Sequence, residues 1–290
     1  MDAINGWLEI CITEPFSYQS VKKSPMATPY FSIIVTTHQR PALLARALKS
    51  VRVNTLHDYE IIVVADSLDA DTMQVAAEHL HDADTFIKRT GKPGPAQSRN
   101  FGLQHARGRY VIFLDDDDAF LPDYLANAKR MTEQHPGQVI YTNYRVVQED
   151  RQNNQPQSQL KVNEYSVAQL DVSTLYVKNF IQNHSAIFPR EAVHGRQQDP
   201  HLSSLDDWDF LLNVASDTPF THANILGAVV YKDYVNPQHR RGSSHTANGL
   251  HTVSDYLSIY KKWPAPNAHV RQQRQQLLAS AGQSVPLEWL

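Results

Sequence analysis

The sequence predicts an α/β protein built on a doubly wound, mostly parallel sheet flanked by helices. Short runs rich in Val and Ile alternate with segments of helical period between residues 30 and 143, which is the pattern of strands joined by helical crossovers. Polar residues directly follow several of these runs, as they do where parallel strands end at a ligand site. A chain of 290 residues is also long enough to bury a substantial core.

The elements of the first half follow one another at short intervals. Strands are expected at the short apolar runs, which span residues 31–36, 60–65, 85–88, 110–114 and 139–141. Helices are expected where apolar residues recur at helical spacing, over residues 41–51, 69–80, 96–107 and 122–133. Pro41 suits the first turn of the first helix.

The second half of the chain is less regular. Residues 148–159 are rich in Gln and Asn and lack core-forming residues, so an exposed loop or hairpin tip is expected there. A strand at 185–188, a helix beginning at Asp206 and a strand at 226–231 follow. The predicted organisation is an N-terminal extension (1–29), one α/β domain (30–245, with halves 30–143 and 144–245) and a C-terminal helical tail (246–290).

Composition narrows the class of protein. The formal net charge of −3 argues against a general nucleic-acid binder, and the single cysteine, Cys11, excludes an internal disulfide framework and a cysteine-rich zinc site. No apolar stretch approaches the roughly 20 residues that cross a bilayer, so a cytoplasmic protein is expected. Residues 1–29 lack the basic first segment of a signal peptide. They are either an extension packed on the domain or a segment upstream of a start at Met26.

Four consecutive aspartates, Asp115 to Asp118, directly follow the apolar run 110–114. Like charges this close repel and raise each other's pKa, so a positive partner is expected between them. Oxygen ligands of this kind suit Mg²⁺ or Mn²⁺, and Mg²⁺ in such sites is commonly shared with substrate phosphates. The alternative is a solvated acidic turn, or carboxylates that cap the next helix.

Polar residues end two further strands, at Thr37-His38 and at Asp66-Ser67. Ligands of doubly wound sheets bind outside the carboxyl ends of the strands. The three polar clusters are therefore expected to converge on one cleft.

Four segments resemble the family 2 glycosyltransferases of the GT-A fold. They are FSIIVTTHQRPALLARALKSV, YEIIVVADSLDADT, GPAQSRNFGLQHARGRYVIFLDDDD and LDDWDFLLNVA, and they lie between residues 30 and 215. The resemblance implies a hexosyltransferase that uses a nucleotide-diphosphate donor, most simply a UDP-sugar, with Mn²⁺ or Mg²⁺ and with inversion at the anomeric carbon. It makes residues 30–143 the nucleotide-sugar half and residues 144–245 the acceptor half.

The resemblance assigns the strand-end residues to the donor and its metal. Asp117 and Asp118 of the Asp-x-Asp segment would hold the metal, and Asp115 and Asp116 would face the donor. Thr37 and Asp66 match positions that hold the nucleobase and ribose, although Ala65 stands where a further aspartate is usual. Lys92 and Arg99 would neutralise the diphosphate. Alternatively, Thr37 is a plain strand-end hydroxyl and Arg99 a structural helix residue.

An inverting displacement needs a base for the acceptor hydroxyl. The resemblance gives this role to Asp207, with Asp206 standing where glutamate is usual. The alternative for Asp207 is an N-cap of the following helix, a position that aspartate favours; Asp206 or Asp209 could fill that position instead. Trp208 is either an acceptor-stacking residue or a core residue.

Further residues are expected on the acceptor side or in a lid. His184 precedes a strand and is a candidate for the acceptor side. His239, Arg240 and Arg241 begin a basic, glycine- and serine-containing segment that also includes His245. Arginine binds phosphate bidentately, so this segment is a candidate lid over the diphosphate, and exposed loop residues are the alternative.

The expected product is a glycan of the bacterial surface or one carried on a lipid, so peripheral membrane association is compatible with the sequence. Two rivals remain. A nucleotidyltransferase would usually show a glycine-rich loop after its first strand, and residues 36–40 contain no glycine. The second alternative is a catalytically degenerate sugar-nucleotide binder or scaffold. Ala65 and Asp206, which are small departures from the family pattern, favour it.

Overall fold

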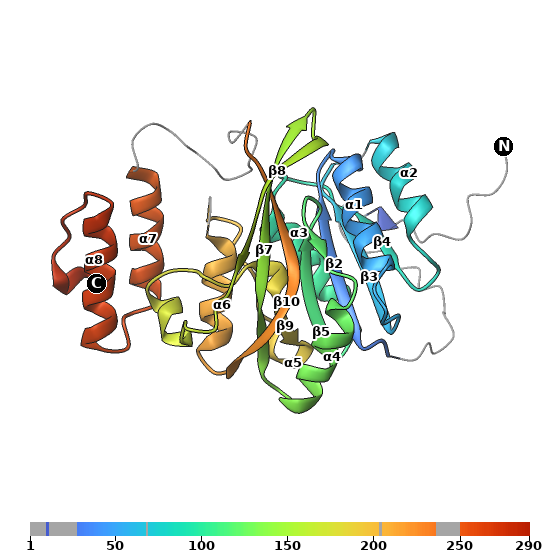
Figure 1. Cartoon of the computed structure of the whole chain (residues 1–290). Helices are drawn as coiled ribbons and strands as arrows, with labels where there is room; N and C mark the ends of the chain where they lie inside the picture. The colour runs from blue at the N-terminus through green and yellow to red at the C-terminus, as the bar shows by residue number, and fades with distance from the viewer. Residues whose placement is uncertain (1–9, 12–27, 68, 203–204, 236–249) are drawn as a thin grey trace, which may run out of the picture.

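A ten-stranded mixed sheet forms the centre of the molecule, and helices lie on both of its faces (Figure 1). The computed structural model describes residues 10–11, 28–67, 69–202, 205–235 and 250–290. Most of the expected N-terminal extension therefore lies outside the described residues, as do His239, Arg240 and Arg241. The predicted α/β class, with a sheet flanked by helices, is confirmed. Among the described residues, no helix combines the length and apolar character needed to span a bilayer.

The first half of the sheet is parallel and has the neighbour order β1-β4-β3-β2-β5. Its strands are β1 (Ile10–Cys11), β2 (Phe31–Thr37), β3 (Tyr59–Ala65), β4 (Thr85–Lys88) and β5 (Tyr110–Asp115). The chain runs outward from β2 to β4 and then returns to add β5 on the other side of β2. The carboxyl ends of β2 and β5 thus flank the point where strand order reverses, which is where doubly wound sheets bind ligands.

The second half of the sheet mixes both directions. It contains β6 (Ala119–Phe120), β7 (Val139–Gln152), β8 (Gln155–Tyr165), β9 (Ala186–Pro189) and β10 (Phe220–Asp233). Strand β9 is antiparallel to both β5 and β7, whereas β10 is parallel to β7. Strand β8 pairs with β7 in a long antiparallel hairpin.

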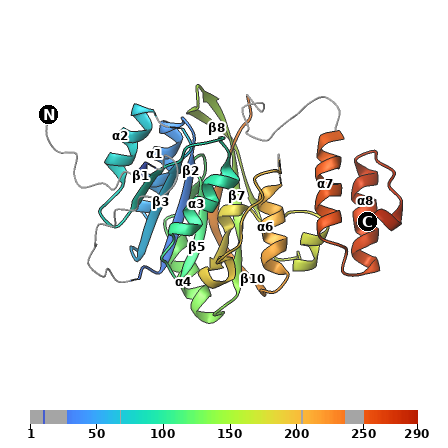
Figure 2. The ribbon, with the colours of Figure 1, turned by 180° about the vertical axis from the view of Figure 1, so that it is seen from behind.

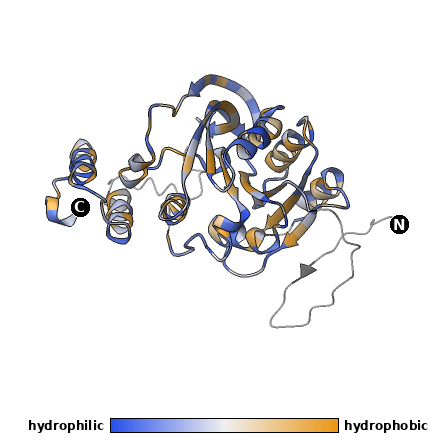
Figure 3. Cartoon of the chain, turned by 90° about the horizontal axis from the view of Figure 1, so that it is seen from below, coloured by the Kyte–Doolittle hydropathy of each residue, from blue (hydrophilic) through white to orange (hydrophobic). Residues whose placement is uncertain are grey.

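Two layers of helices cover the sheet. On one face lie α1 (Pro41–Arg52), α2 (Ala70–His79) and α4 (Tyr124–Gln134) (Figure 1). On the other lie α3 (Pro95–His105), the short α5 (Arg190–Val193) and α6 (Asp206–Ala215), while α7 (Leu250–Lys262) and α8 (Ala268–Ser280) lie beyond α6, farther from the sheet (Figure 2). The strands in the middle are largely apolar, whereas the helices carry both polar and apolar residues (Figure 3).

Helix α3 lies unusually close to β2 because it has a glycine at the contact. A Cβ on Gly102 would fall 2.3 Å from Cγ2 of Ile34, a separation that real Cβ atoms do not show. This close approach holds the second half of α3 against the middle of β2.

The C-terminal tail forms two helices, as expected of a helical tail. Helix α7 packs against α6 through aromatic rings, with the centroids of Trp208 and Tyr256 5.0 Å apart. Arg274 of α8 is fully buried and donates to the backbone carbonyls of Tyr176, Trp263 and Leu290. These contacts attach the tail to the sheet domain.

The main departure from the predicted elements is the length of β7 and β10. Residues 148–152, expected in a loop or hairpin tip, continue β7, and the turn of the hairpin falls at Asn153 and Asn154, which both have positive φ. Glu149 and Arg151 point inward and are only 1% and 5% exposed. The expectation of an exposed tip is therefore correct only for the turn and for β8.

Candidate active site

The three predicted polar clusters do converge at one edge of the sheet. Strand β2 is the neighbour of both β3 and β5, with Thr37 in register with Ala65 and Thr36 in register with Asp115. Asp66 follows β3 directly. The parallel direction of the three strands therefore brings their carboxyl ends together, as expected.

Arginines supply the positive charge expected between the aspartates. Three of the four aspartates pair with an arginine: Asp115 with Arg99 at 2.6 Å, Asp116 with Arg40, and Asp117 with Arg151 at 3.1 Å. Arg40 also approaches Asp117, at 3.4 Å. The cluster is thus already largely neutralised by the protein itself.

Asp116 is a buried structural residue. It is 0% exposed and accepts hydrogen bonds from Thr37 Oγ1 at 2.7 Å and from Arg40 Nε at 3.2 Å. Burial raises the pKa of Asp116 to about 7, against the charge of Arg40. The prediction that Asp116 faces the donor is wrong, because its carboxylate has no exposed surface. The Thr37 hydroxyl donates its hydrogen bond to Asp116, which agrees with the alternative that Thr37 is a plain strand-end hydroxyl.

Asp118 lies beside a buried histidine. Its Oδ1 accepts a hydrogen bond from the backbone N–H of Tyr231 at 2.9 Å, and its Oδ2 lies 3.1 Å from Nδ1 of His184. Burial raises the pKa of Asp118 well above its usual range. Burial also lowers the pKa of His184 to about 4, so the imidazole is neutral at pH 7. His184 is 2% exposed; the expectation that it lines an acceptor surface is therefore wrong in this structure.

Arg99 links the aspartates of β5 to the first turn of α6. Its guanidinium donates to Asp115 at 2.6 Å, to Asp206 at 3.0 Å and to Gln198 Oε1 at 3.0 Å. Burial would raise the pKa of Asp115, but the charge and hydrogen bond of Arg99 hold it below its usual value. Arg99 thus already pairs with two carboxylates of the protein. This favours a structural role for Arg99 over direct contact with a diphosphate.

Asp207 lies in the first turn of α6, next to this bridge. Its side chain is partly exposed and accepts hydrogen bonds from Asn179 Nδ2 at 3.1 Å and from the backbone N–H of Trp208 at 2.7 Å. Burial and the neighbouring charge of Asp206 raise its pKa to about 6. A carboxyl group with this pKa is poised to exchange a proton near neutral pH.

The helix cap expected from the aspartates is absent at α6. Its N-cap is Leu205, in the left-handed conformation with φ of 66°, and it makes no side-chain cap hydrogen bond. Asp206 bonds Arg99 instead, and Asp209 accepts from Lys262 and Trp263. Asp206 and Asp209 are therefore occupied by tertiary contacts, whereas Asp207 accepts from a backbone N–H of its own turn, that of Trp208.

Trp208 belongs to the core. It is 0% exposed, and its Nε1 donates to the backbone carbonyl of Leu175 at 2.7 Å. Of the two alternatives for Trp208, the core residue is the one found and acceptor stacking is not, because the aromatic residues of α7 cover its ring.

A cavity of about 450 Å³ opens between the strand ends and α6. Its lining includes His38, Lys92 and Asp206. Asp66 contacts two residues of the lining, since its carboxylate accepts from the backbone N–H of Gly94 at 2.8 Å and lies 2.6 Å from Nδ1 of His38. The predicted residues Lys92 and Asp66 thus lie at one cavity, next to the Arg99 bridge.

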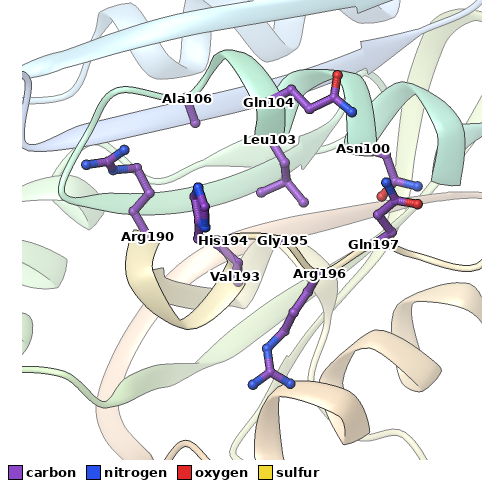
Figure 4. Close-up of a pocket in the computed structure, with 10 residues that line it drawn as sticks. All are labelled: Asn100, Leu103, Gln104, Ala106, Arg190, Val193, His194, Gly195, Arg196 and Gln197. Carbon is purple, nitrogen blue, oxygen red and sulfur yellow. The ribbon is translucent and has the colours of Figure 1, made fainter.

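A second hollow, of about 360 Å³, lies between α3 and the segment that follows β9 (Figure 4). Its lining includes Leu103, Arg190 and His194, but none of the residues predicted for the site. Arg196 extends away from it in Figure 4 and donates to Asn213 and Asp217. The chemistry suggested by the sequence is therefore located at the larger cavity.

The acidic cluster suits a divalent cation by its donor types. Among the described residues, no three His, Cys, Asp or Glu side chains are already arranged around a metal position. Asp118 and His184 nevertheless offer an oxygen and a nitrogen, and both ring nitrogens of His184 are buried without a hydrogen-bond partner. These two residues could hold a cation without displacing an arginine, whereas Asp117 would have to exchange Arg40 or Arg151 for it.

Sequence reasoning missed three residues of the cluster, namely Arg40, Glu149 and Arg151. Arg40 carried a signal, because it lies three residues after the end of β2. Glu149 and Arg151 carried no such signal, because residues 148–152 are all polar; in the structure they are buried on the same face of β7 as Val147. Glu149 accepts from Arg46 at 2.7 Å and from Arg151 at 2.6 Å. It therefore holds the arginine that reaches Asp117.

Comparison with known proteins identifies the family. The sequence model described as Glycosyl transferase family 2 matches residues 32–195, which is more than half of the chain. The chain belongs to this family, and the resemblance seen in the sequence is confirmed.

Individual relatives are more distant. A Campylobacter jejuni protein named GalNAc(5)-diNAcBac-PP-undecaprenol beta-1,3-glucosyltransferase is 40% identical over 101 residues, which cover 34% of this chain and 33% of that protein. The chain thus spans only about a third of that relative's length.

Two solved structures share the fold. The structure of residues 1–349 of Staphylococcus aureus TarS in complex with UDP-GlcNAc has a TM-score of 0.64 at 20% identity, covering 86% of this chain and 71% of that one. The mannosyltransferase PcManGT from Pyrobaculum calidifontis, in complex with GDP-Man and Mn²⁺, has a TM-score of 0.55 at 17% identity, with 92% and 80% covered. The predicted GT-A fold is confirmed by the TarS likeness.

Proposed function

We propose that this protein transfers a sugar from a nucleoside-diphosphate donor, most simply a UDP-sugar, to a hydroxyl group of a glycan or lipid-linked acceptor. The single observation that carries the proposal is the Arg99 bridge from Asp115 to Asp206. It joins a strand-end acidic cluster, suited to a cation and a diphosphate, to the turn that carries Asp207. The bridge thereby links the proposed leaving-group site to the turn that carries the proposed base, and Asp206 of that turn lines the cavity.

The donor assignment rests on the cavity beside the strand ends. Lys92 and His38 line it, and the cationic Lys92 is placed to attract a diphosphate. The TarS structure of similar fold contains UDP-GlcNAc, which favours a uridine nucleotide. The GDP-Man of PcManGT makes a guanosine nucleotide the alternative.

The reaction is an inverting displacement at the anomeric carbon. The acceptor oxygen forms a bond to that carbon while the bond to the diphosphate breaks, and the nucleoside diphosphate leaves with the electron pair. The acceptor proton passes to the Asp207 carboxylate, which faces partly to solvent in the first turn of α6. Asn179, bonded to Asp207 at 3.1 Å, orients the carboxylate.

A bound Mn²⁺ or Mg²⁺ would stabilise the charge that develops on the diphosphate. Asp118 and His184 have the donor types to hold it. Asp117 is 24% exposed at its side chain and can contact the diphosphate region once Arg40 or Arg151 releases it.

The acceptor is proposed to be a glycan or a lipid-linked glycan at a membrane surface. The Campylobacter relative is named for an undecaprenol-linked substrate, which supports a lipid-linked acceptor and a position at the inner face of the membrane. Bacterial surface-polysaccharide assembly is the proposed context.

The test is nucleotide release from a panel of UDP-, GDP-, CMP- and dTDP-sugars with Mn²⁺, with and without candidate acceptors. One donor class should release its nucleotide, and NMR of the product should show the anomeric configuration opposite to that of the donor. Retained configuration would contradict the base assigned to Asp207. Tight donor binding with no release under any condition would favour a degenerate sugar-nucleotide binder.

A further inference from the structure

Tyr165 is an exposed aromatic residue at the end of β8. It is 44% exposed, and its ring stacks on that of Tyr144 in β7, with the centroids 5.4 Å apart and an angle of 12° between the planes. The two residues also lie directly opposite each other in the pairing of β7 with β8. Tyr165 therefore presents a flat ring in a fixed orientation, with one face on Tyr144 and the remainder partly open to solvent.

Tyr144 attaches this aromatic pair to the side of the sheet that carries α6. It packs against the core cluster that contains Trp208 and Phe210 of α6. Burial raises the pKa of the Tyr144 hydroxyl, and a hydrogen bond with the Gln182 side chain acts in the opposite direction. The ring beneath Tyr165 is thus held both by the core and by Gln182.

Strand β8 places the aromatic pair close to the carboxyl end of β5. Strand β9 pairs with β7 at Ile140 and Tyr141, and β8 pairs with β7 from Tyr144 onward. Because β10 occupies the other edge of β7 over this length, β8 and β9 lie end to end along one edge. Tyr165 is at the end of β8 that is next to β9, and β9 is the neighbour of β5.

The segment before β9 connects the aromatic pair to the proposed base. Asn179 donates to Asp207 at 3.1 Å, and its Oδ1 accepts from the backbone N–H of Ile181 at 3.0 Å. Gln182, which follows, is the partner of Tyr144. Residues 179–182 span at most about 14 Å even when extended, which is the length of a short oligosaccharide. The aromatic pair therefore lies within reach of an acceptor whose reactive hydroxyl is at Asp207.

A fixed and partly exposed aromatic ring suits a sugar. One face of a pyranose ring is made of C–H groups and is apolar, and such groups pack favourably on the electron-rich face of an aromatic ring. Ligand sites commonly combine aromatic side chains with a few polar groups that fix the orientation of the ligand. Gln182 is a polar group of this kind beside the pair.

We propose that the ring of Tyr165, supported by Tyr144, stacks on a second sugar ring of the acceptor, next to the ring whose hydroxyl reacts. This inference rests on the proposed function for the identity of its ligand, but saccharide binding is tested without sugar transfer. It makes the acceptor an oligosaccharide of two or more rings. Tyr165 is then a residue that determines specificity for acceptor length.

The test is saturation-transfer NMR on the full chain with UDP and Mg²⁺, using cellobiose, lactose and N,N′-diacetylchitobiose as probes. At least one disaccharide should bind wild-type protein, and more tightly than the methyl glycoside of its non-reducing sugar. Replacing the ring in Tyr165→Ala should lower the affinity for the disaccharide by about fivefold, as expected for one aromatic contact, and should abolish its advantage over the methyl glycoside. Tyr165→Trp keeps a flat ring and should retain the advantage.

Val162→Ala is the matched control. Val162 is 49% exposed and belongs to the same strand, but it lies on the opposite face from Tyr165, because successive side chains of a strand alternate. This variant should bind the disaccharide as wild-type protein does. Tyr165→Leu retains an apolar side chain without a flat ring, and it should bind as weakly as Tyr165→Ala. Circular dichroism and the melting temperature of each variant establish that it is folded.

Three results would overturn the inference. They are an absence of disaccharide binding to folded wild-type protein with UDP, an unchanged affinity in folded Tyr165→Ala, and an equal loss in Val162→Ala. The last result would assign the effect to the stability of β8 rather than to the ring. Failure of nucleotide release alone would leave saccharide binding at Tyr165 standing and would count only against the proposed function.

Discussion

Asp209 of α6 accepts a hydrogen bond from Nε1 of Trp263, at the end of α7, at 2.7 Å. The carboxylate also accepts from Lys262 Nζ at 2.7 Å and is 1% exposed. The C-terminal tail is thus bonded to the helix whose first turn carries Asp207. This contact gives the tail a structural role at α6 that its sequence, rich in Arg and Gln, did not indicate.

Replacing Trp263 with phenylalanine should destabilise the protein by about 1–3 kcal/mol, because a buried carboxylate loses one of its donors. The free energy of unfolding from urea denaturation measures the effect. Trp289→Phe is the matched control, since Trp289 is 69% exposed, and it should change stability by less than about 0.5 kcal/mol. Equal free energies of unfolding for the two variants would show that the Asp209–Trp263 contact does not stabilise the protein.

Replacing Asp207 with asparagine should lower kcat by about 10²–10⁴-fold, the usual contribution of a general base. The Kd for the donor nucleotide should remain within about twofold, because Asp207 lies on the proposed acceptor side. Steady-state transfer and calorimetric binding of UDP measure the two quantities. Asp71→Asn on the exposed surface of α2 is the control. Loss of nucleotide affinity in parallel with kcat would place Asp207 in the donor site instead.

The pH dependence of kcat follows from the raised pKa of Asp207. Burial and Asp206 raise this pKa to about 6, and only the ionised carboxylate accepts a proton. The rate should therefore be constant above about pH 7 and fall about tenfold per pH unit well below pH 6. A profile of kcat from about pH 5 to 8 checks this, and a midpoint near pH 4, as for an unperturbed carboxyl, would contradict it.

Replacing Arg99 with methionine should destabilise the protein by about 3–5 kcal/mol, because it leaves Asp115 and Asp206 as uncompensated charges in a partly buried site. Urea denaturation gives the value. Arg130→Met serves as control, since Arg130 is an exposed residue of α4. Adding Asp206→Asn to Arg99→Met should recover part of the loss. If the double variant is less stable than the single one, the repulsion between the two carboxylates is not the cause.

The sequence was sufficient for β2, β3, β4 and β5 of the parallel half, whereas β1 lies in the segment expected to be an extension. The four predicted strands are short apolar runs near helical segments, and the polar residues at their ends lie together because parallel strands end on one side. The position of Asp207 in the first turn of a helix was also predictable. Its catalytic role remains a prediction.

Long-range pairing explains what the sequence could not show. Arg40, Arg99 and Arg151 come from three different elements, and no local pattern tells which aspartate each one reaches. The burial of Trp208 depends on α7, which is distant in sequence, so a tryptophan beside the proposed base was open to either interpretation. Glu149 was not recoverable, since residues 148–152 are all polar and their alternating burial appears only in the folded β7.

The most direct test of the account is a thermal-shift panel of UDP-, GDP-, CMP- and dTDP-sugars, each with and without Mn²⁺. A ligand that binds only the folded state at 100 times its Kd adds about 2.7 kcal/mol of stability, enough to shift the melting temperature by several degrees. We expect a UDP-sugar to give this shift in wild-type protein and only when Mn²⁺ is present. A folded sample that shows no shift with any nucleotide sugar, with or without Mn²⁺, would contradict the proposed donor site.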